Sequence, residues 1–241
     1  MSKQMQGKVC VITGGAGSIG AASAKLLLSE GAKVMLVDLS EAALTKVAAG
    51  IGGDAAGDGL ACCAADVTKS DQVGTAVAHT VATFGKIDVL FSNAGNFGTV
   101  APIADYPEDV FDSVLAVHIK GAFLCAKHAV PQMNDGGSII LNSAAPDAKG
   151  DDSANPYAAI NAALQSLAPT WTSELRDREI RVSVISADTT ETPGINALAG
   201  MHRPGPDAAG ELGNYPRGTV PPAHHVTAQK IADTALFLAV G

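Results

Sequence analysis

Short apolar runs alternate along the chain with longer segments in which Ala and Leu recur at helical spacing. The apolar runs are rich in β-branched residues and predict strands at 8–13, 33–38, 59–66, 87–93, 137–143 and 180–186. The intervening segments predict helices at 19–29, 41–49, 70–84, 107–133, 156–176 and 228–239. Strands that alternate with helices are typical of repeated β-α-β units. We therefore expect an α/β fold: a doubly wound, Rossmann-like parallel sheet with helices on both faces.

The stretch from 189 to 226 breaks this alternation, because it is rich in Pro and Gly and has few aliphatic runs. Loops of this length usually serve function, so we expect a substrate loop here. No linker or internal repeat divides the chain, and its 47% hydrophobic content suits one large aliphatic core. We expect residues 1–241 to form a single domain.

Charge and composition limit the classes of partner that the protein can bind. The net charge is −8, which disfavours nucleic acid, because phosphate backbones are bound mainly through Lys and Arg. No run approaches the roughly 20 apolar residues of a membrane span, and the N-terminus does not resemble a signal peptide. We expect a soluble, cytoplasmic protein. Its four cysteines then stay reduced, with the adjacent Cys62 and Cys63 on opposite faces of a strand.

A glycine-rich segment, TGGAGSIG, follows the first predicted strand and opens the first predicted helix. Gly15, Gly17 and Gly20 stand in the register G-x-G-x-x-G. Glycines permit a tight turn and let backbone N–H groups and the helix N-terminus approach a pyrophosphate. We expect a dinucleotide site here, which also includes the neighbouring positions Gly14, Ser18 and Ile19.

Asp38 ends the second predicted strand and is followed by Leu39. An acidic residue at this spacing hydrogen-bonds the hydroxyls of the adenosine ribose and repels a 2′-phosphate. No Arg or Lys lies in the glycine turn or directly after Asp38. The residues therefore favour NAD over NADP.

Several motifs together resemble the classical short-chain dehydrogenase/reductase family. They are TGGAGSIG, the pair Asp66-Val67, the run Ser92-Asn93-Ala94-Gly95, and Tyr157 beside Pro156. The resemblance implies an NAD-dependent oxidoreductase acting on a secondary alcohol or ketone, assembled as a homo-oligomer, either a tetramer or a dimer. It implies that Asp66 and Val67 bind adenine, that the turn of Asn93, Ala94 and Gly95 lies beside the cofactor, and that Thr192 and Tyr157 face the nicotinamide half.

The catalytic positions implied by the resemblance depart from the family pattern. The family uses an Asn, a Ser, a Tyr and a Lys, the last two spaced as YxxxK. Tyr157 is present, but the Lys position is Asn161 and the Asn position is His118. The Ser position is Ala144, with Ser143 one residue early and therefore facing the other side of a strand.

These departures predict weak catalysis. A tyrosine with no neighbouring cation has a pKa of ~10, so about one in a thousand is ionised at pH 7. A relay from Tyr157 through water to His118 is one substitute, and a buried histidine that fills the Asn space is the alternative. The candidate catalytic set is thus Tyr157, Ser143, His118 and Asn161, and no spacing predicts a metal site.

Three functions remain open. The first is a weak NAD(H)-dependent oxidoreductase, and the second is a non-catalytic NAD-binding pseudoenzyme or regulatory subunit. The third, an interaction module without cofactor, requires the glycine pattern and Asp38 to be coincidental. The chain also stops at Gly241, where the family adds a seventh strand. We therefore expect six strands and a sheet edge that is exposed unless a partner covers it.

Overall fold

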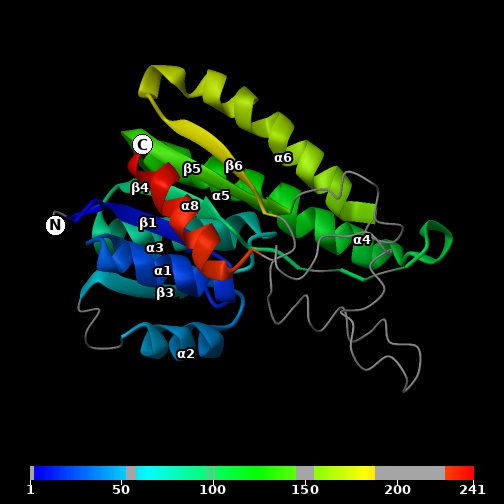
Figure 1. Cartoon of the computed structure of the whole chain (residues 1–241), viewed down its shortest axis with the longest axis horizontal. Coiled ribbons are helices and arrows are strands. Elements are labelled where there is room, and N and C mark those ends of the chain that lie inside the picture. The colour runs from blue at the N-terminus through cyan, green and yellow to red at the C-terminus, as the bar shows by residue number, and fades with distance from the viewer. Residues whose placement is uncertain (1–2, 53–57, 97, 100, 145–154, 188–225) are drawn as a thin grey trace.

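One six-stranded parallel sheet organises the molecule (Figure 1). The computed structural model describes residues 3–52, 58–96, 98–99, 101–144, 155–187 and 226–241. The strands are β1 (Val9–Thr13), β2 (Lys33–Asp38), β3 (Leu60–Ala64), β4 (Ile87–Ser92), β5 (Met133–Ala144) and β6 (Arg181–Ala187). Their order is β3-β2-β1-β4-β5-β6, with every neighbouring pair parallel. The predicted fold class is confirmed.

Outside the segment 107–133, the helices follow the predicted segments closely. They are α1 (Ser18–Ser29), α2 (Glu41–Ile51), α3 (Ser70–Phe84), α4 (Glu108–Leu115), α5 (Gly121–Ala129), α6 (Asn155–Glu174) and α8 (Ala228–Val240). Short 3₁₀ turns lie at Ile103–Asp105, Val130–Gln132 and Arg176–Arg178.

The single helix predicted at 107–133 was wrong in two respects. A π-helical turn, Ala116–Lys120, separates α4 from α5. At the other end Pro131 lies in a 3₁₀ turn, and Met133 already belongs to β5, where it pairs with Ile87. Proline lacks a backbone N–H and so ends the helical ladder before the predicted boundary.

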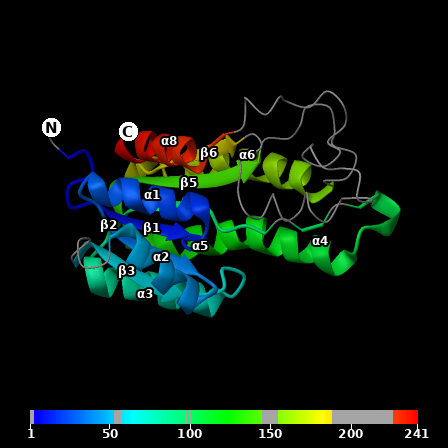
Figure 2. The same ribbon diagram turned by 60° about the horizontal axis from the view of Figure 1, so that its bottom comes forward.

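Two hydrophobic cores cover the two faces of the sheet. Side chains alternate along the strands, so Val11 lies in one core and Ile12 in the other. The first core receives α3, α5 and α6, and the second receives α1, α2 and α8. Figure 2 shows α1 and α8 on one side of the strands and α3 and α5 on the other. As expected, Cys62 and Cys63 pack into opposite cores.

The strand order reverses between β1 and β4. From β1 the chain builds outward through β2 to β3, then crosses back to place β4 on the other side of β1. In open α/β sheets such a switch point leaves a crevice beyond the carboxyl ends of the strands, where ligands bind. The topology therefore places the candidate site after Thr13 and Ser92, the last residues of β1 and β4.

Much of the predicted substrate loop, 189–225, lies outside the described residues, so the loop and the single-domain boundary stay predictions. Within the described part, no helix is both long and apolar enough to cross a membrane.

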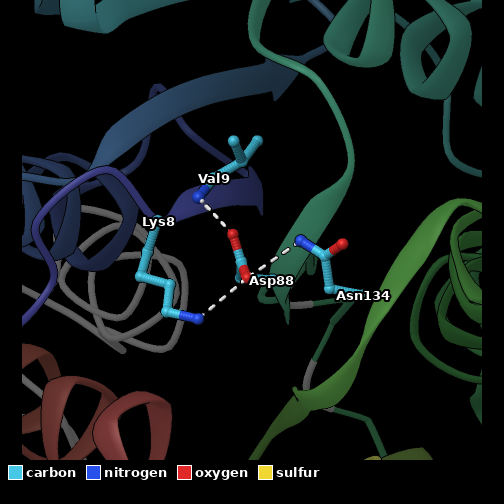
Figure 3. A network of polar contacts seen from close by, with 4 residues as sticks. All are labelled: Lys8, Val9, Asp88 and Asn134. Carbon is cyan, nitrogen blue, oxygen red and sulfur yellow. Dashed lines mark hydrogen bonds and ion pairs between the residues drawn. The ribbon is translucent and has the colours of Figure 1, made fainter. Parts of the chain in front are cut away.

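A buried carboxylate joins the opposite, amino ends of the central strands (Figure 3). Asp88 on β4 accepts hydrogen bonds from the backbone N–H of Val9 at 2.9 Å, from Lys8 Nζ at 3.0 Å and from Asn134 Nδ2 at 3.1 Å. Asp88 is 8% exposed, so its loss would leave the buried N–H of Val9 without an acceptor. This network links the starts of β1, β4 and β5.

Replacing Asp88 with Ala should therefore lower the free energy of unfolding by about 2–3 kcal/mol, because the Val9 N–H and the Asn134 amide lose their acceptor. Urea unfolding followed by circular dichroism measures this change. The control is Lys8→Ala, which removes only the half-exposed partner and should cost less than about 1 kcal/mol. Equal losses of unfolding free energy in the two variants would contradict the conclusion that Asp88 stabilises the fold more than Lys8 does.

Candidate functional site

The turn between β1 and α1 depends on the absence of side chains. Gly14 adopts a φ of +66°, which favours glycine. A Cβ on Gly20 would lie 2.3 Å from the carbonyl oxygen of Gly14, a distance that no real structure tolerates. A Cβ on Gly15 would lie 2.9 Å from Leu36 Cβ. These three glycines let the start of α1 pack directly on the end of β1.

The N-terminus of α1 has the chemistry of an anion site. Its N-cap is Gly17, which offers no side-chain cap, and the first turn contains no acidic residue. The first hydrogen bond of the helix runs from Ala21 N–H to Gly17 O, so the N–H groups of Ser18, Ile19 and Gly20 have no acceptor within the helix. Unpaired N–H groups and the helix dipole together favour negative charge here.

Asp38 at the end of β2 is tied to the same turn. One carboxylate oxygen accepts from Ala16 N–H at 2.9 Å, and the other accepts from Leu39 N–H at 2.7 Å. Each oxygen keeps a further lone pair for a ligand hydroxyl. The Leu39 side chain beside it is 71% exposed, which leaves an apolar surface next to the carboxylate.

Asp66 and Val67 follow β3, and their side chains have different roles. Asp66 Oδ1 accepts from the N–H and the hydroxyl of Thr68, at 2.8 and 2.7 Å, and so fixes the turn. Val67 is 7% exposed and packs against Gly121 at the start of α5, where a Cβ would lie 2.9 Å from Val67 Cγ2. The Val67 side chain therefore belongs to the core, and only its backbone is left to contact a ligand.

A polar chain connects the carboxyl ends of β1, β4 and β5. Thr13 Oγ1 accepts from the N–H groups of Asn93 and Ala94, both at 3.0 Å. Asn93 Nδ2 donates to the carbonyls of Thr13 and Gly14, at 3.0 and 3.3 Å. Asn142 Nδ2 on β5 then donates to Asn93 Oδ1 at 2.9 Å. The switch point is thus held by side chains as well as by the strand ladder.

His118 lies in the π-helical turn between α4 and α5. It packs on Gly95, which follows Asn93 and Ala94 in the loop after β4. A Cβ on Gly95 would lie 2.6 Å from His118 Cε1. His118 Nε2 lies 3.0 Å from the carbonyl oxygen of Asn96 and 3.2 Å from its nitrogen. Burial lowers the pKa of His118, and the hydrogen bond to Asn96 opposes part of that effect. A neutral imidazole that supports the loop after β4 fits this geometry.

Asn161 on α6 meets the ends of β5 and β6. Its Oδ1 accepts from Ser186 Oγ at 3.0 Å, from Gln165 Nε2 at 3.1 Å and from Ser143 Oγ at 3.2 Å. Asn161 is 2% exposed and Ser143 is 5% exposed. Of the four candidate catalytic residues, the structure therefore joins Ser143 and Asn161 directly.

Other candidates are placed only in part. The backbone of Tyr157 lies on α6, one helical turn before Asn161, and its side chain is outside the described residues. Thr192 falls entirely outside them. Within the described part of the chain, no group of three or more His, Cys, Asp or Glu side chains could hold a metal ion.

Sequence reasoning missed several polar residues that join this site. They are Thr13, Asn142, Gln165 and Ser186. Asn142 and Ser186 do carry a signal, because each is a polar residue that directly follows an apolar run near the end of its strand. Gln165 follows Asn161 by four positions on a helix, a spacing that brings two side chains together.

Comparisons with known proteins agree with this geometry. A family model described as enoyl-(acyl carrier protein) reductase matches residues 14–240. Momilactone A synthase of Oryza sativa subsp. japonica is 35% identical over 99% of this chain and 85% of its own length. The 3-oxoacyl-(acyl-carrier-protein) reductase of Thermotoga maritima is 33% identical over 98% of this chain and 92% of its own length.

Among solved structures, an NAD⁺-bound xylitol dehydrogenase superposes with a TM-score of 0.86 at 31% identity, covering 99% of this chain and 94% of its own. The likeness thus spans the sheet, the glycine turn and the helices on both faces.

Gly20 and Gly17 predict different outcomes for the same substitution to alanine. Gly20→Ala forces the turn and α1 apart and should cost about 2–3 kcal/mol of unfolding free energy. Gly17→Ala places a Cβ no closer than 3.3 Å to Gly14 O, so it should cost less than about 1 kcal/mol. Urea denaturation of both variants provides the measurement. The close packing would be disproved by a Gly20→Ala protein as stable as the wild type.

Proposed function

The chain belongs to the short-chain dehydrogenase/reductase family, and we propose that it is an NAD(H)-dependent oxidoreductase acting slowly on a secondary alcohol or ketone. The observation that carries this proposal is the glycine turn. The missing Cβ atoms leave room for a pyrophosphate, and the uncapped helix N-terminus attracts its negative charge. Asp38 lies beside this turn.

The choice of NAD rests on Asp38. Its carboxylate is fixed by two backbone N–H groups, and its remaining lone pairs suit the two hydroxyls of a ribose. A 2′-phosphate in that place would meet a negative charge. The NAD⁺-bound state of the related xylitol dehydrogenase supports the same choice.

A larger set of residues would hold the dinucleotide. We propose for it Gly14, Gly15, Gly17, Ser18, Ile19, Gly20, Asp38, Leu39, Asp66, Val67, Asn93, Ala94, Gly95, Tyr157 and Thr192. When bound, the nicotinamide ring supplies the hydride acceptor or donor of the reaction. The protein supplies position and proton transfer, for which Tyr157 is the candidate acid/base.

Slow turnover follows from what surrounds Tyr157 in sequence. Asn161 replaces the lysine one helical turn later, and no lysine follows Tyr157 before Lys230. Ala144 lacks the hydroxyl that would hold a substrate oxygen, while Ser143 donates instead to Asn161. His118 is engaged with Asn96, so a relay through it stays a prediction.

The same observations support a second candidate function, an NAD-binding protein without turnover. The amide of Asn161 binds serines of β5 and β6, and the dinucleotide turn does not depend on it. Cofactor binding can therefore persist where catalysis does not.

We also propose a cytoplasmic homo-oligomer, either a tetramer or a dimer. Phe111 on α4 and Phe123 on α5 are 36% and 48% exposed, and both helices lie where the family resemblance predicts subunit contacts.

Cofactor choice is tested by calorimetric titration with NADH and NADPH. The wild type should bind NADH at least about tenfold more tightly, because the 2′-phosphate loses a hydrogen bond and gains repulsion at Asp38. In Asp38→Ala this ratio should shrink. The ratio is the informative quantity, since damage to the turn that Asp38 supports affects both cofactors alike. Equal wild-type affinities would refute the NAD assignment.

Catalysis is tested by following NAD⁺ reduction at 340 nm with small secondary alcohols. The rate should rise between pH 7 and pH 9, because a phenol with no neighbouring cation ionises near pH 10. Tyr157→Phe should lower it about 100-fold. An unchanged rate in Tyr157→Phe would place the active site elsewhere. Tight NADH binding with no turnover at any pH would favour the second candidate.

A further inference from the structure

A compact polar cluster joins helix α6 to the last turns of the two edge-side strands, β5 and β6. Ser143 and Ser186 are register partners across these strands. Asn161 Oδ1 accepts from both hydroxyls, and Gln165 Nε2 donates to Asn161 Oδ1 and to Ser186 Oγ, at 3.1 and 3.3 Å. Two strands and one helix therefore meet at a single carboxamide oxygen.

The orientation of this amide is determined by its donors. A carboxamide oxygen accepts, and three neighbouring groups present hydrogens to it. The reversed amide would place N–H groups against the Gln165 N–H. Asn161 is 2% exposed and Ser143 is 5% exposed, so an unmade bond between these two carries the full cost of desolvation, whereas Gln165 and Ser186 are exposed. The buried bond between Asn161 and Ser143 therefore favours the observed position of α6 on β5.

The cluster lies at the carboxyl edge of the sheet, where the candidate site is. Ser143 and Ser186 each stand one residue before the end of their strand. Tyr157 precedes Asn161 by four positions on α6, and residues at this spacing share a helix face. Any shift or tilt of α6 at Asn161 is passed directly to the backbone of Tyr157.

We propose that Asn161 is a positioning residue: its carboxamide oxygen, held by Ser143, Ser186 and Gln165, fixes helix α6 and thereby Tyr157 on the ends of β5 and β6. The seating of α6 stands on the contacts themselves. The relevance of Tyr157 rests on the function proposed above.

The hydrogen-bond donors around position 161 favour a neutral acceptor there over a lysine. An ammonium group has no acceptor, so a lysine here cannot receive the hydrogen of Gln165 Nε2. A charge at position 161, where Asn161 is 2% exposed, also has no carboxylate partner in the cluster. Asn161→Lys alone should therefore loosen α6.

Hydrogen–deuterium exchange of the cofactor-free protein tests the seating of α6. In Asn161→Leu, which keeps the volume and removes the acceptor, amides in the 155–165 stretch should exchange about tenfold faster, and those of α1 should not change. Asn161→Asp retains an acceptor oxygen and should stay within about threefold of the wild type. Gln165→Met removes one donor of three and should fall between them, which keeps the test available if Asn161→Leu folds poorly.

The matched control is Thr80→Val. Thr80 is fully buried on α3 and donates to Ala76 O, so its loss removes a buried hydrogen bond away from the cluster. It should leave exchange in 155–165 unchanged. The proposal is overturned if Asn161→Leu matches the wild type there, if α1 and α6 loosen equally, or if Asn161→Asp is as fast as Asn161→Leu.

Cofactor and rate measurements on the same variants separate this proposal from the proposed function. Asn161→Leu should reduce kcat at least about tenfold with a smaller change in NADH affinity, and Asn161→Asp should restore most of kcat. A wild type that neither binds NADH nor turns over alcohol refutes the proposed function, while the exchange pattern still decides the role of Asn161.

Discussion

The contact between Gly20 and Gly14 is the constraint on which the rest of the site depends. Because neither residue has a side chain, α1 begins directly against the turn after β1. Asp38 then reaches Ala16 N–H from the end of β2, and Asn93 reaches Gly14 O from the end of β4. A larger residue at position 20 would displace the turn from both partners. One backbone approach thus sets the positions of the uncapped N-terminus of α1, the Asp38 carboxylate and the loop after β4.

The two ends of the sheet are joined by different chemistry. At the amino ends, the charged Asp88 gathers Lys8, Val9 and Asn134. At the carboxyl ends, the links are neutral: Thr13, Asn93 and Asn142 form one chain, and Asn161 with its serines forms another. These neutral links add no charge at the carboxyl edge, so among the described residues Asp38, Asp66 and the N-terminus of α1 contribute the charge there.

The sequence predicts those parts of the fold that depend on neighbours in the chain. The apolar runs found the six strands of the described residues, and the glycine register found the turn, because each signal lies within about ten consecutive residues. The π-helical turn at His118 was not predictable in this way, since it meets Gly95 and Asn96, which are distant in sequence. The same holds for Asn161: as a substitution for lysine it indicates only a loss, and its partners Ser143 and Ser186 become visible only when β5 and β6 are paired.

Substitutions affect the two halves of the site in different ways. The dinucleotide half is built from backbone N–H groups and missing Cβ atoms, so it needs glycine at a few positions and tolerates change elsewhere. The half near Tyr157 depends on where one helix sits. Asn161 has taken over the seating of that helix with a neutral acceptor, so returning the family's lysine removes a structural contact at the same step as it adds a charge. Recovery of fast catalysis therefore requires a new acceptor for Gln165 and the two serines as well as a cation beside Tyr157.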